Sequence, residues 1–263
     1  MNLYIRISHT DICFACYEAT NAQQFQFQTF HLRPQVSLMV NLREAVQQIE
    51  MLRQSYQKVE VFVNAPVTPV PLTEFQEEDV EATYRFCFSQ TESMRVFYDT
   101  VPAANVVLLF ALPNDTCRTL DEIFPNVRYN ASLTPVVQHF VKKATTLSAD
   151  KRVFVNTYEG AIDVIIFSDN RLLMLNTYEV RTLADADYYL FNMLRHLAVD
   201  PNTTPIFVSG DANLRNPLIE ELQHYAPKVF PVNPAAEFNR HLVATTEQVP
   251  YDLMCALLKT RII

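Results

Sequence analysis

Three aspartates lie where carboxylates could serve a catalytic site. Asp11 follows a short polar turn, Asp163 lies within an apolar strand-like segment, and Asp211 follows another such segment. Two or three carboxylates that converge can bind a pair of divalent metal ions, as in metal-dependent nucleases. We favour the alternative that they are hairpin-turn and strand-end carboxylates facing water, because such chemistry on nucleic acid also needs a basic surface.

Two further local patterns could support chemistry near the N-terminus. His9 precedes Asp11 by two residues and could form an acid–base pair with it, although residues at this spacing are more common as ordinary turn residues. Cys13 and Cys16 have C-x-x-C spacing. On a strand an offset of three residues sends side chains to opposite faces, so we expect buried thiols rather than a redox pair or a zinc site.

Glycine is unusually rare in this chain. Only Gly160 and Gly210 occur in 263 residues, whereas average usage is about 7%. Glycine allows a backbone to approach a phosphate closely and to adopt positive φ. The sequence therefore excludes the glycine-rich dinucleotide fingerprint, the P-loop and the nucleophile elbow.

Composition and charge restrict the class of protein further. The chain is 49% hydrophobic and 19% charged with a net charge of −8, and its lysines and arginines are scattered. Nucleic-acid binding needs a basic surface, so we expect no nucleic-acid partner. No apolar stretch is long enough to span a membrane, and the N-terminal residues lack signal-peptide features. We therefore expect a cytoplasmic protein without a membrane span.

The elements that must position these residues follow the same order twice. Alternating and helical periodicities predict three strands, a helix and a fourth strand in the first half, over 3–7, 12–16, 25–28, 39–56 and 59–63. The second half repeats this order over 153–155, 162–166, 171–178, 183–197 and 205–210. A βββαβ unit is therefore used twice.

Further helices and strands alternate after each βββαβ unit. In the first half we expect helices over 74–88, 114–124 and 134–147 and strands over 105–112 and 127–131, with an irregular stretch at the prolines 66, 69 and 71. In the second half we expect helices over 214–226, 234–245 and 251–261 and a strand over 228–232. The boundary falls at 145–150, which predicts subdomains 1–147 and 148–263.

This duplicated order resembles the actin-like ATPase, or ribonuclease H-like, superfold. The segment 105–144 with the strands after it resembles the actin-like proteins of type IV pilus assembly. More narrowly, four motifs resemble an uncharacterised Bacteroidetes family of actin-fold proteins, namely LMLNTY at 173–178, DADYYL at 185–190, LAVD at 197–200 and FVSG at 207–210. The resemblance implies an α/β protein with two βββαβαβα-type subdomains, mixed sheets and a cleft between the subdomains.

The resemblance also implies where a nucleotide would bind. ATP-binding members have an Asp-x-Gly-type turn in each meander hairpin, which holds the phosphates and metal, and a Gly-Gly against adenosine. The matching positions of this chain, which we take as cleft candidates together with Asp163, are Ser8, Asp11, Asn156, Tyr158, Gly210 and Asp211. Neither turn retains Asp-x-Gly, and Tyr158 would occupy space that a phosphate needs. This departure indicates that nucleotide chemistry is lost.

A polar and aromatic cluster is a separate candidate. Asp185, Tyr188 and Tyr189, together with Asp187, could form a patch that docks a partner or stacks a ligand. The structural alternative, which we favour, is a first helical turn whose acidic residues complement the helix dipole, with one tyrosine packed on the sheet.

These observations predict a non-catalytic interaction or scaffold protein on a degenerate actin-like fold. We expect an unidentified protein partner, no catalytic residues, no metal and no cofactor, and the sequence leaves a homodimer open. One alternative is a divergent nucleotide-binding protein or metal-dependent phosphohydrolase that uses the cleft between subdomains. Another is a small-molecule sensor with an apolar cleft.

Overall fold

The computed structural model describes residues 1–18, 25–169 and 171–258. The chain divides into two compact units. The first contains Met1–Thr100 and Val107–Thr134, and the second contains Val101–Val106 and Pro135–Ile263. The helix expected over 134–147 therefore belongs with the second unit.

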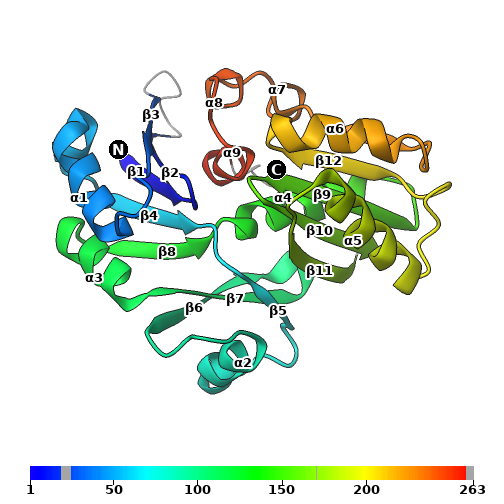
Figure 1. Ribbon diagram of the computed structural model, residues 1–263, viewed down its shortest axis with the longest axis horizontal. Coiled ribbons are helices and arrows are strands. Elements are labelled where there is room, and N and C mark those ends of the chain that lie inside the picture. The colour runs from blue at the N-terminus through cyan, green and yellow to red at the C-terminus, as the bar shows by residue number, and fades with distance from the viewer. Residues whose placement is uncertain (19–24, 170, 259–263) are drawn as a thin grey trace. The chain divides into compact units, whose positions relative to one another are not determined.

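The first unit is built on a five-stranded mixed sheet. Its strand order is β3-β2-β1-β4-β8 (Figure 1). The strands are β1 (Asn2–Ile7), β2 (Asp11–Tyr17), β3 (Gln26–His31), β4 (Lys58–Val63) and β8 (Val127–Ala131). β1, β2 and β3 form an antiparallel meander, while β4 and β8 add in parallel. The predicted three-strand meander and fourth strand are confirmed.

The first helix of this unit ends earlier than its periodicity predicts. α1 (Leu38–Gln48) begins at Ser37, whose hydroxyl accepts from the amide of Val40. It ends at Ile49, where the backbone is extended, and a short 3-10 turn, η1 (Glu50–Arg53), follows. The prediction of one helix over 39–56 is therefore wrong beyond Gln48. Met51 and Leu52 in η1 are still buried, so apolar spacing continued past the end of the α-helix.

The first unit also contains a small second sheet, which the sequence did not predict. Its order is β5-β7-β6, with strands β5 (Thr68–Pro71), β7 (Val106–Pro113) and β6 (Met94–Val101). Only β7 was expected. β5 contains prolines and lies at the sheet edge, where a missing amide donor is tolerated. A 3-10 turn η2 (Glu77–Asp79) and the helix α2 (Val80–Cys87) replace the single helix expected over 74–88. Val80 and Tyr84 of α2 pack against this sheet.

The helix expected over 114–124 is confirmed. A short 3-10 turn, η3 (Pro102–Ala104), leads into β7, and α3 (Asn114–Ile123) follows β7 directly. Leu120 of α3 is fully buried, and Arg43 of α1 contacts Glu122 of α3 at 3.2 Å. α1 and α3 therefore lie in contact with each other.

The second unit repeats the topology of the first sheet. Its strand order is β11-β10-β9-β12-β13. The strands are β9 (Lys151–Tyr158), β10 (Ala161–Ser168), β11 (Arg171–Glu179), β12 (Ile206–Gly210) and β13 (Val229–Pro231). Antiparallel pairing joins β9, β10 and β11, and parallel pairing joins β9, β12 and β13. The predicted duplication and the mixed α/β fold are confirmed.

Side chains of β9 alternate between two apolar layers of the second unit. Val153 and Val155 pack in the cluster that also contains residues of α5 (Leu183–His196) and α6 (Ala212–Leu222). Phe154 points to the opposite face and stacks on Phe140 of α4 (Leu133–Thr146) at 4.5 Å between ring centroids. Helices therefore cover both faces of this sheet.

The C-terminal segment forms three short helices in the second unit. They are α7 (Pro234–Glu237), α8 (Leu242–Thr245) and α9 (Tyr251–Leu257). The single helix expected over 234–245 is wrong, because Asn239 and Arg240 adopt positive φ and end α7. The expected helix over 251–261 extends past the described residues, so only its first part is confirmed.

Glu237 joins this C-terminal segment to α4. It forms an ion pair with Lys143, lies 3.0 Å from Nε2 of His139, and accepts a hydrogen bond of 2.9 Å from the hydroxyl of Tyr251. Burial alone would raise the pKa of the Glu237 carboxyl. Hydrogen bonds and charge from His139 and Lys143 outweigh burial and lower that pKa to about 2.

We expect Glu237→Gln to lower the free energy of unfolding by about 2 kcal/mol at pH 7, because a charge-assisted network is replaced by neutral contacts. A depressed carboxyl pKa stabilises the fold above its unfolded value of 4.5, and this contribution is lost as pH falls toward 2. Between pH 7 and pH 3, the free energy of unfolding from urea denaturation should fall less for the variant than for the native chain. Glu247→Gln, at an exposed position, is the matched control, and an equal effect there would contradict the assignment.

Candidate functional site

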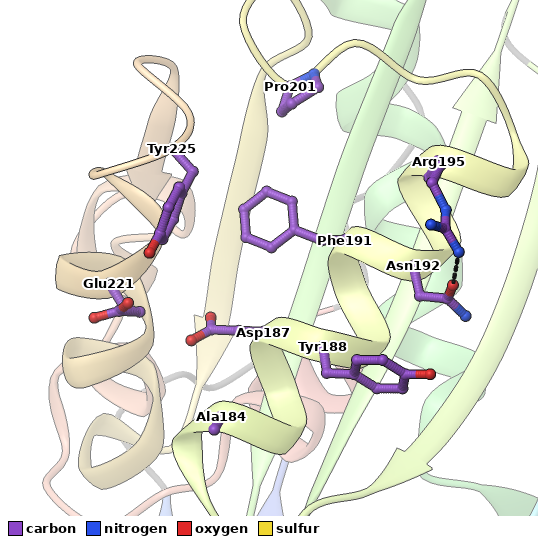
Figure 2. A pocket seen from close by; sticks show the side chains of 9 residues that line it. All are labelled: Ala184, Asp187, Tyr188, Phe191, Asn192, Arg195, Pro201, Glu221 and Tyr225. Carbon is purple, nitrogen blue, oxygen red and sulfur yellow. Dashed lines mark hydrogen bonds between the residues drawn. The ribbon is translucent and has the colours of Figure 1, made fainter.

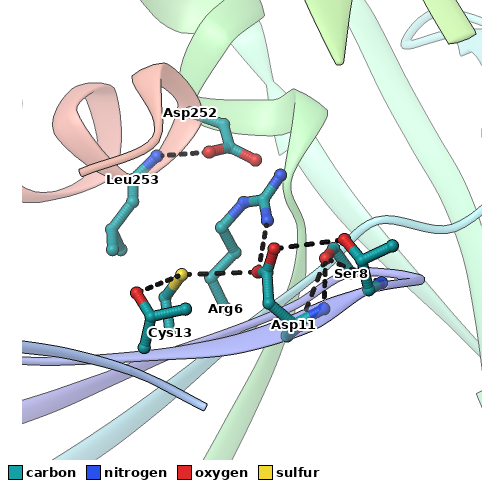
Figure 3. Close-up of polar contacts among 8 residues, drawn as sticks. Arg6, Ser8, Asp11, Cys13, Asp252 and Leu253 are labelled. Atoms are coloured by element: carbon teal, nitrogen blue, oxygen red, sulfur yellow. Dashed lines mark hydrogen bonds and ion pairs between the residues drawn. The ribbon is translucent and has the colours of Figure 1, made fainter. Parts of the chain in front are cut away.

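The first meander turn is closed by its own serine. The hydroxyl of Ser8 accepts from the amides of Thr10 at 3.3 Å and Asp11 at 3.1 Å, and donates to the carbonyl of Asp11 at 3.1 Å (Figure 3). Backbone amides in a turn are the groups that bind anions. Here two of these amides already have a partner within the turn.

Asp11 is engaged by side chains of the same sheet. Arg6 of β1 lies 3.4 Å from its Oδ1, and the thiol of Cys13 donates to the same oxygen at 3.4 Å (Figure 3). Burial, followed by the negative charge of Asp11, raises the pKa of the Cys13 thiol to about 12. Cys13 and Cys16 are both free and buried. The expectation of buried thiols at this C-x-x-C spacing is confirmed.

The second meander hairpin places a buried carboxylate among neutral donors. Asp163 of β10 is 3% exposed. Its Oδ1 accepts from the hydroxyls of Thr177 at 2.7 Å and Tyr158 at 3.1 Å, and its Oδ2 accepts from Nδ2 of Asn156 at 3.1 Å. Ser209 of β12 donates to Oδ1 of Asn156 at 3.0 Å. We call Asn156, Tyr158, Asp163, Thr177 and Ser209 the Asp163 network.

Burial controls the titration of the Asp163 network. Burial raises the pKa of Asp163 to about 6 against the opposing effect of its three hydrogen bonds. Burial and then the charge of Asp163 raise the pKa of Tyr158 well above its usual range. The expectation that Asp163 faces water is therefore wrong. Strand periodicity alone did not reveal that cross-strand neighbours on both sides are polar and enclose it.

The end of β12 approaches the backbone of β9 very closely. Gly210 has φ +95°, and a Cβ at this position would lie 1.9 Å from the carbonyl oxygen of Thr157. The amide of Asp211 donates to that same oxygen at 2.8 Å. The side chain of Asp211 accepts from the amide of Asn213 as the N-cap of α6. Gly210 and Asp211 thus connect a strand to a helix at the position where the resemblance implies an adenosine contact.

The carboxylates proposed for a metal pair have separate local roles. Asp11 belongs to the first unit, while Asp163 and Asp211 belong to the second. The carboxylate of each accepts hydrogen bonds from residues near it in its own unit. Over residues 1–18, 25–169 and 171–258, no group of three histidine, cysteine, aspartate or glutamate side chains is arranged to bind a metal ion.

The cluster of Asp185, Tyr188 and Tyr189 divides between structural and exposed positions. Asp185 forms a capping box with Thr182, accepting from its amide at 2.9 Å. Tyr189 stacks on Tyr178 of β11 at 4.8 Å, so it packs on the sheet as the structural alternative predicted. Tyr188 is 65% exposed. Of these three residues, Tyr188 is the one available to a partner.

Thr177 was not among the candidate residues, but it lies opposite Asp163 in the β10–β11 register. The candidate Asn156 lies opposite Asp163 in the β9–β10 register. Pairing the predicted strands residue by residue would have revealed this polar row. Arg6 was visible only as one member of an alternating strand. Asp187 was interpreted as part of the helix turn, and the structure places it in the lining of a groove between α5 and α6.

The strand order shared by the two sheets, with its paired hairpin turns, defines a protein of the actin-like ATPase fold. A structure from Bacteroides thetaiotaomicron VPI-5482, a protein with actin-like ATPase fold and unknown function, is similar with a TM-score of 0.81 and 25% sequence identity, covering 94% of this chain and 96% of that one. The PilM-PilN type IV pilus biogenesis complex matches with a TM-score of 0.58 and 11% identity, covering 98% of this chain and 97% of that one.

A family model described as "Protein of unknown function (DUF3822)" matches residues 1–229, and the chain belongs to this family. A comparison with functionally curated proteins returned no match. The predicted resemblance to an actin-fold family is confirmed. Within the part of the chain that the structure describes, no helix is long and apolar enough to cross a membrane.

Proposed function

We propose that this protein is a non-catalytic interaction or scaffold protein on an actin-like fold that has lost nucleotide chemistry. The observation that carries the proposal is the closed first turn, in which the Ser8 hydroxyl occupies the amides of Thr10 and Asp11. A phosphate would have to displace this hydroxyl to reach those donors.

The second turn supports the same conclusion. Tyr158 stands where the resemblance implies a glycine, and its hydroxyl is hydrogen-bonded to the buried Asp163. A bulky side chain that is fixed in this way leaves less space for a phosphate, and the carboxylate beside it already accepts three hydrogen bonds. Each turn therefore opposes phosphate binding through side chains of its own unit.

Calorimetric titration of the full chain with ATP and MgCl2 tests the loss of nucleotide binding. We expect no saturable heat, because both phosphate turns are closed by their own side chains. The same titration on Ser8→Gly, which frees the two amides, asks whether Ser8 alone blocks the site. Micromolar binding of ATP to the unmodified chain would end the proposal.

The interaction role has its own test. We expect the full chain, isolated from native lysate, to co-elute with a second protein in a constant ratio through gel filtration. Hydrolysis of ATP by the purified chain, in the absence of any such partner, would contradict a non-catalytic role.

A further inference from the structure

The second unit carries an exposed aromatic groove between α5 and α6 (Figure 2). The groove has a volume of about 660 Å³. Phe191 and Tyr225 meet edge to face across it, with ring centroids 5.6 Å apart, and Tyr188 lies at its rim. Tyr188 and Tyr225 are 65% and 59% exposed. Tyrosine at such exposure offers a large contact surface with few rotatable bonds.

One end of the groove is acidic, and one carboxylate oxygen there accepts no hydrogen bond from the described residues. Asp187 and Glu221 line it, the first from α5 and the second from α6 (Figure 2). Oδ1 of Asp187 is buried and has no hydrogen-bond partner among the described residues. Burial, followed by the charge of Glu221, raises the pKa of Asp187 to about 6. A buried acceptor without a donor, next to a second negative charge, is unfavourable in the free protein.

The cation that lines the other end does not relieve this charge. Arg195 lies two turns along α5 from Asp187, and its guanidinium donates to Oδ1 of Asn192 at 3.0 Å (Figure 2). The groove is therefore polarised, with an acidic end at Asp187 and Glu221 and a basic end at Arg195. A cationic group would be attracted to the first end and repelled from the second.

We infer that this groove docks a segment of a partner protein through an arginine side chain that binds Asp187 and Glu221. The inference rests on the proposed interaction role and names the chemistry of the partner. A guanidinium has five donors in one plane, which suits two carboxylates, and it stacks on aromatic rings. Apolar neighbours of that arginine would pack on Phe191 and Tyr225. Arginine and tyrosine are both enriched at protein interfaces.

A matched pair of small probes tests the inference on the full chain. Benzoyl-arginine amide combines a guanidinium with an aromatic ring, and benzoyl-citrulline amide has nearly the same shape without the charge. We expect the arginine probe to shift amide resonances of α5 and α6 in heteronuclear NMR spectra, and to bind at least about 10-fold more tightly than the citrulline probe. Equal binding of the two probes, or shifts confined to other elements, would overturn the inference.

Variants assign the effect to the two carboxylates. We expect Asp187→Asn and Glu221→Gln each to weaken the arginine probe by about 10-fold, while Glu220→Gln, an exposed carboxylate on the same helix, leaves it unchanged. Asp187→Asn should also leave the urea midpoint unchanged or raise it, since it removes an unpaired buried charge. A lower midpoint with unchanged probe affinity would show that Asp187 is only structural.

The partner itself separates this inference from the proposed function. A co-purified partner should lose affinity for the Asp187→Asn variant. Retention of the partner by that variant would refute the groove assignment and leave the interaction role standing. Micromolar ATP binding would instead remove the proposed function, whatever the probes do at the groove.

Discussion

Gly210→Ala should destabilise the second unit much more than Gly160→Ala, the same substitution at the other glycine of this chain. The added Cβ would lie 1.9 Å from the carbonyl oxygen of Thr157 and 2.7 Å from its amide nitrogen, both of which are backbone atoms of β9. Gly210 and Thr157 are paired in the sheet, so neither backbone can move without breaking the end of the ladder. The positive φ of +95° adds strain for any residue with a side chain.

We therefore expect Gly210→Ala to lower the free energy of unfolding by about 4 kcal/mol or more, at the upper end of single substitutions. Gly160→Ala is the matched control. Its φ is also positive, at +71°, but a Cβ there would meet no atom within 4 Å. Only backbone strain remains, and we expect a loss of about 1 kcal/mol. Urea denaturation compares the two variants, and equal losses would show that close packing at Gly210 is not the cause.

The second large effect concerns Asp163. Removing its carboxyl by Asp163→Ala would leave donors on Asn156, Tyr158 and Thr177 facing a small void in a buried site. Unsatisfied buried donors are costly, so we expect a loss of about 4 kcal/mol in the free energy of unfolding at pH 7. Asp163→Asn retains one oxygen acceptor, and the expected loss falls to about 1–2 kcal/mol. Glu159→Gln, exposed in the same hairpin, should change little.

The pH dependence of stability distinguishes the charge of Asp163 from its shape. Its pKa rises from 3.8 in the unfolded chain to about 6 in the folded protein, so the folded state binds the proton more tightly. This contribution is complete below pH 3.8 and is lost as pH rises through 6, with a size of about 3 kcal/mol. Urea midpoints measured from pH 4 to pH 7 should decline more in the native chain than in Asp163→Asn, in which the raised pKa of Asp187 still contributes a decline. Parallel profiles for the two proteins would refute the raised pKa.

Apolar periodicity predicted the principal sheets of this protein but not its irregular elements. Ile5 and Phe14 pair across the first meander, and Ile162 faces the core of the second unit, as alternation indicated. β6 carries Arg95 and Asp99 and lacks a clean alternation of apolar residues, which explains why this strand was not recognised. Short elements depend on tertiary pairing more than on local pattern, so their positions could not be derived from spacing.

Asn156, Tyr158 and Gly210 were identified by the resemblance to actin-like ATPases, and the structure adds the contacts of each. Ser209 reaches Asn156 across 53 positions of the chain. A contact of this range depends on strand order and register, which periodicity does not specify.

The sequence by itself determined that this chain folds as a duplicated βββαβ unit and that it cannot form a glycine-rich phosphate loop. Both conclusions follow from residue type and local spacing, because side-chain alternation and backbone freedom are properties of neighbouring residues. Only the tertiary structure decided that Asp163 is enclosed by three donors, that Gly210 touches the backbone of Thr157, and that Asp187 faces Glu221 in one groove. These depend on which distant segments pack together, and burial then changes the energy of every polar group between them.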